Sequence, residues 1–147
     1  RLVPGYEAPV YIAWSAKNRS PLIRIPAVKG LNTRIELRCP DPCCNPYLAL
    51  AGILAAGLDG ISNKIQPPPP IDANIFSLSR EEKEKVNVNC LPIDLKEAIE
   101  EIKKSTLLRE VLGEHIYQKY IEAKEEEWED YRKQVTSWEL KHYLTKY

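Results

Sequence analysis

The apolar run from Tyr47 to Leu58, within "NPYLALAGILAAGLDG", constrains the fold of this chain more than any other feature. Asn45 is a favoured helix N-cap and Pro46 suits the first helical position, so a helix should begin there. Apolar residues lie all around this helix, which is typical of a helix buried in a core. At roughly fifteen residues it is shorter than a bilayer-spanning helix, so we expect no membrane segment.

Three strand-like runs precede this helix, at residues 10–16, 21–26 and 33–38, and they are rich in β-branched and aromatic residues. The short connections between them favour an antiparallel meander. We therefore expect an α+β fold. It would comprise an antiparallel sheet, a buried helix packed on the sheet and a helical C-terminal region.

The second half of the chain changes character at "QPPPP", which favours an extended linker. Beyond it, Asp94 is a candidate N-cap for an amphipathic helix, and acidic helical sequence continues to the end. The sequence thus divides into residues 1–65 with the sheet and buried helix, a Pro-rich linker at 66–92 and a helical tail at 93–147.

Charge is distributed unevenly along the chain. The 147 residues have a net charge of zero, so nucleic acid is not an expected partner. Residues 1–40, however, contain seven Lys or Arg and only two acidic residues. A local excess of arginine favours anion binding. The sequence contains no methionine, so we expect it to be a piece of a longer protein.

The strand "TRIELR" places Arg34, Glu36 and Arg38 on one face, because side chains alternate along an extended chain. Alone, this pattern also fits the solvated face of a sheet. Arg24 on the neighbouring strand and Arg19 in a loop extend it into a candidate polyphosphate cradle. The arginines should keep Glu36 ionised, and such a carboxylate could ligate a divalent metal whose other ligands lie elsewhere.

Two further features are less informative from the residues alone. Glu7, in the loop "PGYEAP", has the pattern of an ordinary surface carboxylate. The cysteines at 39, 43, 44 and 90 do not have zinc-site spacing and are typical of thiols in a reducing compartment. We therefore expect a cytoplasmic protein.

Four motifs occur in order: "RLVPGYEAP", "NRS", "RIELR" and "PDPCCNPY". Together they resemble the C-terminal catalytic half of class I glutamine synthetase, closely over about the first 65 residues and more loosely beyond. The resemblance implies an ATP-dependent glutamate–ammonia ligase that uses Mg²⁺ or Mn²⁺ and forms γ-glutamyl phosphate. Its partners would be glutamate, ammonium, ATP and further copies of itself, as a dodecamer of the full-length protein.

The resemblance also implies a role for each matching residue. Those roles are glutamate binding for Arg1, ammonium deprotonation on a closing flap for Glu7, and stabilisation of the transferring phosphoryl group for Arg19. Arg24 and Arg34 would contact nucleotide phosphates, Glu36 would ligate metal, and Arg38 would act near the γ-phosphate and glutamate. ATP binding thus falls to Arg19, Arg24 and Arg34, and glutamate binding to Arg1, Glu7, Arg19 and Arg38.

Two alternatives remain open. One is a γ-glutamyl ligase that uses an organic amine in place of ammonium. The other is a non-catalytic regulatory module that keeps the fold. Because the remaining metal ligands of this family lie upstream of the matching motifs, we expect the chain alone to be inactive.

Overall fold

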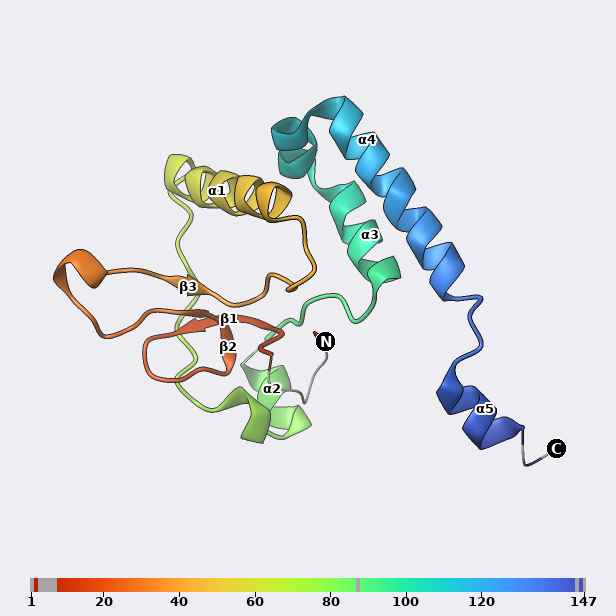
Figure 1. Cartoon of the computed structure of the whole chain (residues 1–147). Coiled ribbons are helices and arrows are strands. Elements are labelled where there is room, and N and C mark those ends of the chain that lie inside the picture. The colour runs from red at the N-terminus through yellow and green to blue at the C-terminus, as the bar shows by residue number, and fades with distance from the viewer. Residues whose placement is uncertain (1, 3–7, 87, 145, 147) are drawn as a thin grey trace. The chain divides into compact units, whose positions relative to one another are not determined.

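The computed structural model describes residues 2, 8–86, 88–144 and 146, without the side chains of residues 80 and 84. It divides into two compact units, Arg1–Ile93 and Asp94–Tyr147. The first unit contains a three-stranded sheet and the second is helical, as Figure 1 shows. The predicted α+β class is confirmed.

The sheet contains β1 (Tyr11–Ser15), β2 (Pro21–Arg24) and β3 (Glu36–Leu37), in that spatial order. β2 and β3 pair antiparallel, as predicted, whereas β1 and β2 pair parallel. The prediction of a wholly antiparallel sheet is therefore wrong for the first pair of strands.

The parallel pairing depends on a short return between the strands at residues 16–20. Parallel strands normally need a much longer connection. Here the pairing register shifts between Tyr11 and Trp14, and such a bulge bends a strand. The Ser15 hydroxyl also accepts hydrogen bonds from the backbone N–H groups of Lys17 (3.0 Å) and Asn18 (3.3 Å), which turns the chain back at the end of β1.

The Pro-rich segment packs along β1 instead of only joining two regions. Ile75 is fully buried in a core cluster with Val10 and Tyr11. Three backbone hydrogen bonds join the segment to the strand region: Ile71 N–H to Trp14 O (2.9 Å), Ile12 N–H to Asn89 O (2.8 Å) and Leu91 N–H to Val10 O (2.8 Å). The segment includes the 3₁₀ turn η2 (Ile75–Ser77) and α2 (Arg80–Lys85). Another 3₁₀ turn, η1 (Gly30–Asn32), precedes β3.

The apolar helix forms where predicted, as α1 (Pro46–Ser62), and the Asn45 side chain accepts from the N–H groups of Tyr47 and Leu48. The prediction that it is buried on the sheet is wrong, because none of its residues is buried. Leu50 and Leu54 are each 64% exposed. A helix with apolar residues all around it needs other protein surfaces to pack against. The described part of this chain does not bury α1 in this way.

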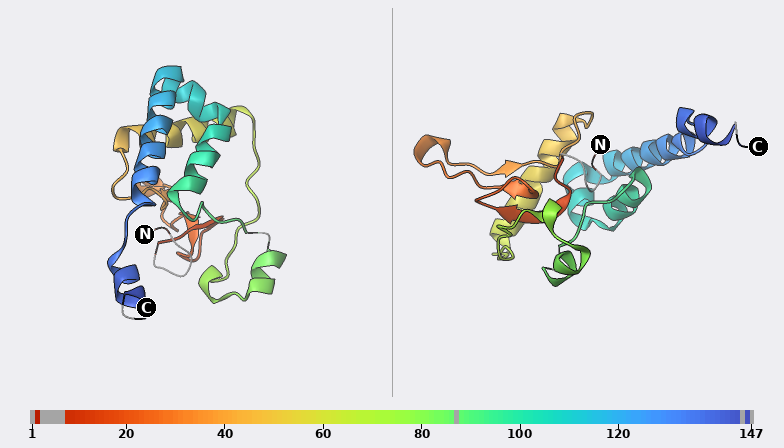
Figure 2. Two further views of the ribbon diagram at one scale, coloured as in Figure 1. Left: turned by 90° about the vertical axis from the view of Figure 1, so that its right-hand side faces the viewer. Right: turned by 90° about the horizontal axis from the view of Figure 1, so that it is seen from below.

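The second unit is built on α3 (Leu95–Lys104) and α4 (Thr106–Tyr131), followed by α5 (Ser137–Tyr143). Asp94 caps α3, as predicted. α3 and α4 lie side by side in Figure 2, around a core of Ile99, Tyr117 and Ile121. Among the described residues, no helix has both the length and the apolar character that crossing a bilayer requires.

Candidate functional site

The predicted charged face is present on β2 and β3, where Arg24 lies opposite Glu36 in the antiparallel register. Directly opposite residues project to the same face of a sheet, so their side chains meet. Arg24 Nη1 lies 3.0 Å from Glu36 Oε2, and Arg34 Nη2 lies 2.8 Å from Glu36 Oε1. Arg34 Nε donates to the same Oε1 at 3.2 Å. The two guanidinium groups thus hold both oxygens of one carboxylate.

This arrangement keeps Glu36 ionised, as the sequence predicted. Hydrogen bonds from Arg24 and then from Arg34 lower the pKa of Glu36 below its ordinary value of 4.5. The Glu36 side chain is 28% exposed, so water reaches the group. Glu36 is therefore a fixed anion within a cationic surface.

Arg38 and Arg19 meet beside this cluster. The Arg38 N–H donates to the carbonyl of Leu22 at 2.9 Å, which continues the β2–β3 pairing. The Arg38 guanidinium donates through Nη1 to the carbonyl oxygen of Arg19. Contacts therefore connect Arg38 on the sheet with the loop that carries Arg19.

Four of the predicted arginines thus lie near one another in sequence and register, in support of the predicted cationic face. Arg24 ends β2, Arg38 directly follows β3, Arg34 lies two residues before β3, and Arg19 lies in the loop between β1 and β2. A surface of guanidinium groups can bind phosphate or carboxylate oxygens through paired hydrogen bonds. The other two predicted site residues, Arg1 and Glu7, lie outside the described residues.

The described residues do not form a divalent-metal site by themselves. Among them, no group of three or more His, Cys, Asp or Glu side chains is placed to hold an ion. Glu36 contributes one carboxylate, and both of its oxygens already accept from arginines. Magnesium and manganese bind several oxygen ligands, so most of the ligands of a metal here would have to come from other parts of the protein.

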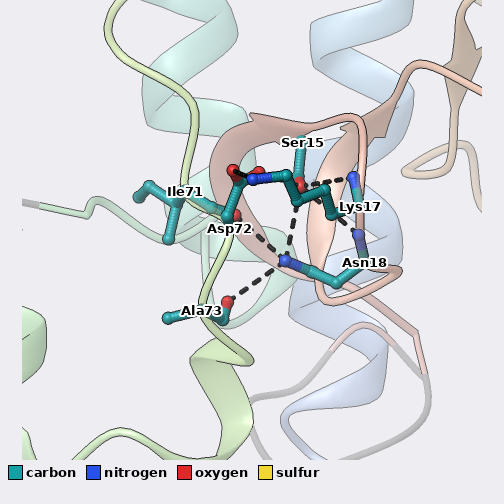
Figure 3. A network of polar contacts seen from close by, with 6 residues as sticks. All are labelled: Ser15, Lys17, Asn18, Ile71, Asp72 and Ala73. Atoms are coloured by element: carbon teal, nitrogen blue, oxygen red, sulfur yellow. Dashed lines mark hydrogen bonds and ion pairs between the residues drawn. The ribbon is translucent and has the colours of Figure 1, made fainter.

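A polar network that the sequence analysis did not assign joins the 16–20 loop to residues 71–73, as Figure 3 shows. Lys17 Nζ lies 2.7 Å from Asp72 Oδ2, and the buried Ser15 hydroxyl donates to Asp72 Oδ1 at 2.9 Å. The Lys17 hydrogen bond, followed by that of Ser15, lowers the pKa of Asp72. The available sequence signal was Asn18 in the "NRS" motif, since an Asn side chain can bond the backbone two residues later and so close a turn.

The four cysteines, which all fall within the described ranges, form no disulfide. Burial raises the pKa of the Cys39 thiol, so this thiol is less reactive than an exposed one.

Comparison with known proteins agrees with the motifs. The family model described as "Glutamine synthetase, catalytic domain" matches residues 1–143. A glutamine synthetase of Methanosarcina mazei is 61% identical over 145 residues, which are 99% of this chain and 32% of the relative. The chain therefore spans about a third of the length of this curated relative.

Solved structures also match this chain, at lower identity. A structure described as "GmaS/ADP complex-Conformation 1" has a TM-score of 0.79 and 34% identity, over 94% of this chain and 30% of that one. A cryo-EM structure of Plasmodium falciparum glutamine synthetase has a TM-score of 0.77 and 27% identity, over 97% of this chain and 36% of that one. This chain belongs to the glutamine synthetase catalytic-domain family.

Proposed function

We propose that the protein containing this chain ligates ammonia to L-glutamate at the expense of ATP, giving L-glutamine, ADP and phosphate. The observation that carries the proposal is the Arg24–Glu36–Arg34 cluster, in a chain whose family match runs from residue 1 to 143. One structural neighbour is described as a complex with ADP, which supports a nucleotide as the phosphoryl donor.

The proposed reaction has two steps. A side-chain carboxylate oxygen of glutamate attacks the γ-phosphorus of ATP, the bond to the β,γ-bridging oxygen breaks, and γ-glutamyl phosphate and ADP form. Ammonium gives one proton to a base and becomes ammonia, which attacks the acyl carbon. The bond from this carbon to the phosphate oxygen breaks, and the nitrogen passes a second proton to the departing phosphate. Neither step needs a protein nucleophile, because glutamate is the nucleophile in the first step and ammonia in the second. Charge neutralisation and alignment accelerate the phosphoryl transfer of the first step.

The arginines suit the first step. We assign Arg24 and Arg34 to the nucleotide phosphates, while Arg19 neutralises charge on the phosphoryl group in transit. Arg38 is assigned to the end of the site where the γ-phosphate meets glutamate. Each guanidinium can donate two parallel hydrogen bonds to phosphate or carboxylate oxygens, which gives orientation as well as charge.

Arg1 and Glu7 complete the assignment. Arg1 would bind a carboxylate of the substrate glutamate, and Glu7 would close over the site and take the proton from ammonium. A closing loop that excludes water would protect the acyl phosphate from hydrolysis.

We propose Mg²⁺ or Mn²⁺ as the metal, with Glu36 as one ligand. The described residues alone do not fit a metal site, so the proposal places the remaining ligands in the parts of the protein that this chain lacks. The two arginines would have to release at least one Glu36 oxygen for it to bind a metal.

The same proposal covers assembly and location. We propose that the full-length protein is a cytoplasmic homo-oligomer, a dodecamer by analogy with the family, and that the isolated chain is inactive. The chain is only about a third of its relative, which supports the expectation of an incomplete site.

Phosphate release from ATP by the full-length parent tests this function. The assay would contain glutamate and magnesium, with either ammonium or a panel of primary amines, and this chain would be measured beside the parent. Ammonium-dependent release by the parent alone is expected. Release only with an amine would identify a γ-glutamyl ligase of another specificity, and no release with any acceptor would favour a non-catalytic module.

Glu36→Ala in the parent tests the proposed role of Glu36 separately from the effect of removing any carboxylate. We expect phosphate release to be abolished and the binding of magnesium, measured separately by titration, to weaken. Glu126→Ala is the matched control, because Glu126 is an exposed carboxylate on α4 of the helical unit. Unchanged turnover in Glu36→Ala would reject the proposed role of Glu36.

A further inference from the structure

Asn18 anchors the 16–20 loop to a segment far away in the sequence. Its Nδ2 donates to the carbonyl oxygen of Ile71 at 3.1 Å and to that of Ala73 at 3.2 Å. Figure 3 shows the Asn18 amide directed at these two carbonyl groups, with a third contact to the Ser15 hydroxyl. One side chain therefore bridges the loop after β1 and the start of the segment that contains Ile75.

The other end of the same amide shapes the loop locally. Asn18 Oδ1 accepts from the N–H of Ser20 at 2.9 Å and from its hydroxyl at 2.7 Å. A side-chain oxygen that accepts from the N–H two residues later closes an Asx turn, and Arg19 is the residue enclosed by this turn. Ser20 is itself buried, and its hydroxyl accepts from the N–H of Ile75 at 3.0 Å.

The backbone of Arg19 is therefore fixed, while its side chain is available to bind a ligand. Its carbonyl oxygen accepts from Arg38, and both of its sequence neighbours are anchored. Its exposed guanidinium makes no hydrogen bond or ion pair with any residue in the described part of the chain. This is the arrangement expected of a group that is held ready for a ligand.

We propose that Asn18 is a positioning residue for the phosphoryl-transfer reaction: it holds the Asx turn against residues 71–73 and so fixes where the Arg19 guanidinium points. The inference rests on the proposed function, in which Arg19 stabilises the transferring phosphoryl group. Asn18 itself touches no reacting atom. It acts by keeping Arg19 at the distance and angle that the transition state requires.

The structure indicates that the loop can survive the loss of this amide. The buried Ser15 hydroxyl holds the start of the loop independently, because it accepts from the Lys17 N–H and donates to Asp72. Ser20 still bonds the Ile75 N–H at the other end of the loop. Removing the Asn18 side chain should therefore loosen Arg19 while leaving β1, β2 and their core in place.

A double-mutant cycle in the full-length parent tests the proposal, with kcat for phosphate release as the measured quantity. We expect Asn18→Ala to lower kcat by about 10- to 100-fold, the range that small misplacements of a reacting group produce. Arg19→Ala should lower kcat at least as much. Because Asn18 acts through Arg19, adding Asn18→Ala to Arg19→Ala should cause little further loss.

Asn63→Ala is the matched control. Asn63 also donates through Nδ2, to Asp59 Oδ1 at 2.8 Å, but it lies at the C-terminal end of α1. The kcat of the Asn63→Ala variant should stay within about twofold of the parent value, since separate, non-contacting sites act independently. Asn18→Asp keeps the oxygen that closes the turn but brings a carboxylate towards two carbonyl oxygens, so it should also lower kcat.

Amide hydrogen exchange distinguishes positioning from a purely structural role. In Asn18→Ala, the Ser20 amide should lose protection, while the Leu91 amide, bonded to Val10 in the core, should keep it. Loss of protection at both amides would overturn the proposal, because the variant would then have damaged the fold as a whole.

Two kinetic outcomes separate this inference from the function on which it rests. In the first outcome, the parent releases phosphate, but the losses of kcat in Asn18→Ala and Arg19→Ala multiply in the double variant. The positioning role is then overturned and the function stands. If the parent releases no phosphate with ammonium or any amine, the proposed function fails and the inference fails with it.

Discussion

Arg24 on β2 and Glu36 on β3 lie opposite each other in the sheet and form an ion pair, with Arg24 Nη1 3.0 Å from Glu36 Oε2. This pair joins the two strands through the same side chains that we assign to the nucleotide and the metal. Arg34 approaches the other carboxylate oxygen, so Glu36 is shared between two cations.

Arg24→Gln should raise the pKa of Glu36, because the Arg24 hydrogen bond is the largest cause that lowers it. The rise should be incomplete, since Arg34 still donates to the carboxylate. A carboxyl-carbon NMR titration of the chain measures this pKa. Arg132→Gln, which removes the same charge from the helical unit, is the control. An unchanged Glu36 pKa in Arg24→Gln would show that the pair does not persist in solution.

The same shift gives a pH dependence for stability. A carboxyl whose pKa is lowered on folding stabilises the folded state above its unfolded pKa, and that contribution is lost as pH falls through the folded pKa. Glu36 should therefore stabilise the first unit fully above its ordinary value of 4.5, and this contribution should be lost as pH falls from there through the lowered pKa. In Arg24→Gln, urea unfolding should depend less on pH in this acidic range.

Glu114, in the helical unit, is a second carboxyl whose pKa is lowered, and its shift is large. Its carboxylate lies 2.6 Å from Arg109 Nε and accepts from Gln118, and its pKa is lowered to about 2. Arg109→Ala should return this pKa most of the way towards 4.5. The stabilisation from Glu114 should be complete above 4.5 and disappear as pH falls to about 2. NMR titration of both proteins checks this, and equal Glu114 pKa values would contradict it.

Gly113 interrupts α4 with φ 71° and ψ 153°, a conformation that L-residues rarely adopt. Gly113→Ala should destabilise the helical unit by about 1–3 kcal/mol, although a methyl group there meets no neighbour. Urea unfolding of the chain, followed by circular dichroism, measures the cost. Gly57→Ala in α1 is the control, and it should gain up to about 1 kcal/mol from helix propensity. Equal effects of the two substitutions would contradict the backbone explanation.

Asn45 caps α1 through two hydrogen bonds, at 3.0 Å to the Tyr47 N–H and 3.3 Å to the Leu48 N–H. Asn45→Ala should cost the helix about 1 kcal/mol and speed hydrogen exchange in its first turn. Asn63→Ala, at the other end of the helix, should leave that first turn unchanged. Equal exchange rates at Leu48 in the Asn45→Ala variant and the unmodified chain would argue against the cap.

Local chemistry made parts of this fold predictable. Asn45 and Asp94 were identified as N-caps because a side-chain oxygen before a helical pattern satisfies free backbone N–H groups. The charged face containing Glu36 followed from strand alternation, and the cluster with Arg24 and Arg34 followed from placing neighbouring strands side by side.

The features that the sequence did not predict depend on contacts between residues that are distant in the sequence. The parallel return at residues 16–20 is anchored by the contacts of Ser15 with Asp72 and of Ser20 with Ile75, which have no periodic signal in the sequence. The apolar pattern of α1 shows that a cover is needed but not where that cover lies. The Pro-rich segment is predicted to be an extended linker because four prolines favour polyproline II, and this pattern contains no signal for the packing of Ile75 in the core.

Oxygen transfer is the measurement that tests the central claim most directly. The full-length parent would turn over ATP and ammonium with glutamate carrying ¹⁸O in its side-chain carboxylate, and the phosphate would be analysed by mass spectrometry. If γ-glutamyl phosphate forms, one labelled oxygen passes from each glutamate into the phosphate released. Phosphate free of label, in a reaction that still consumes ATP, would contradict the proposed function.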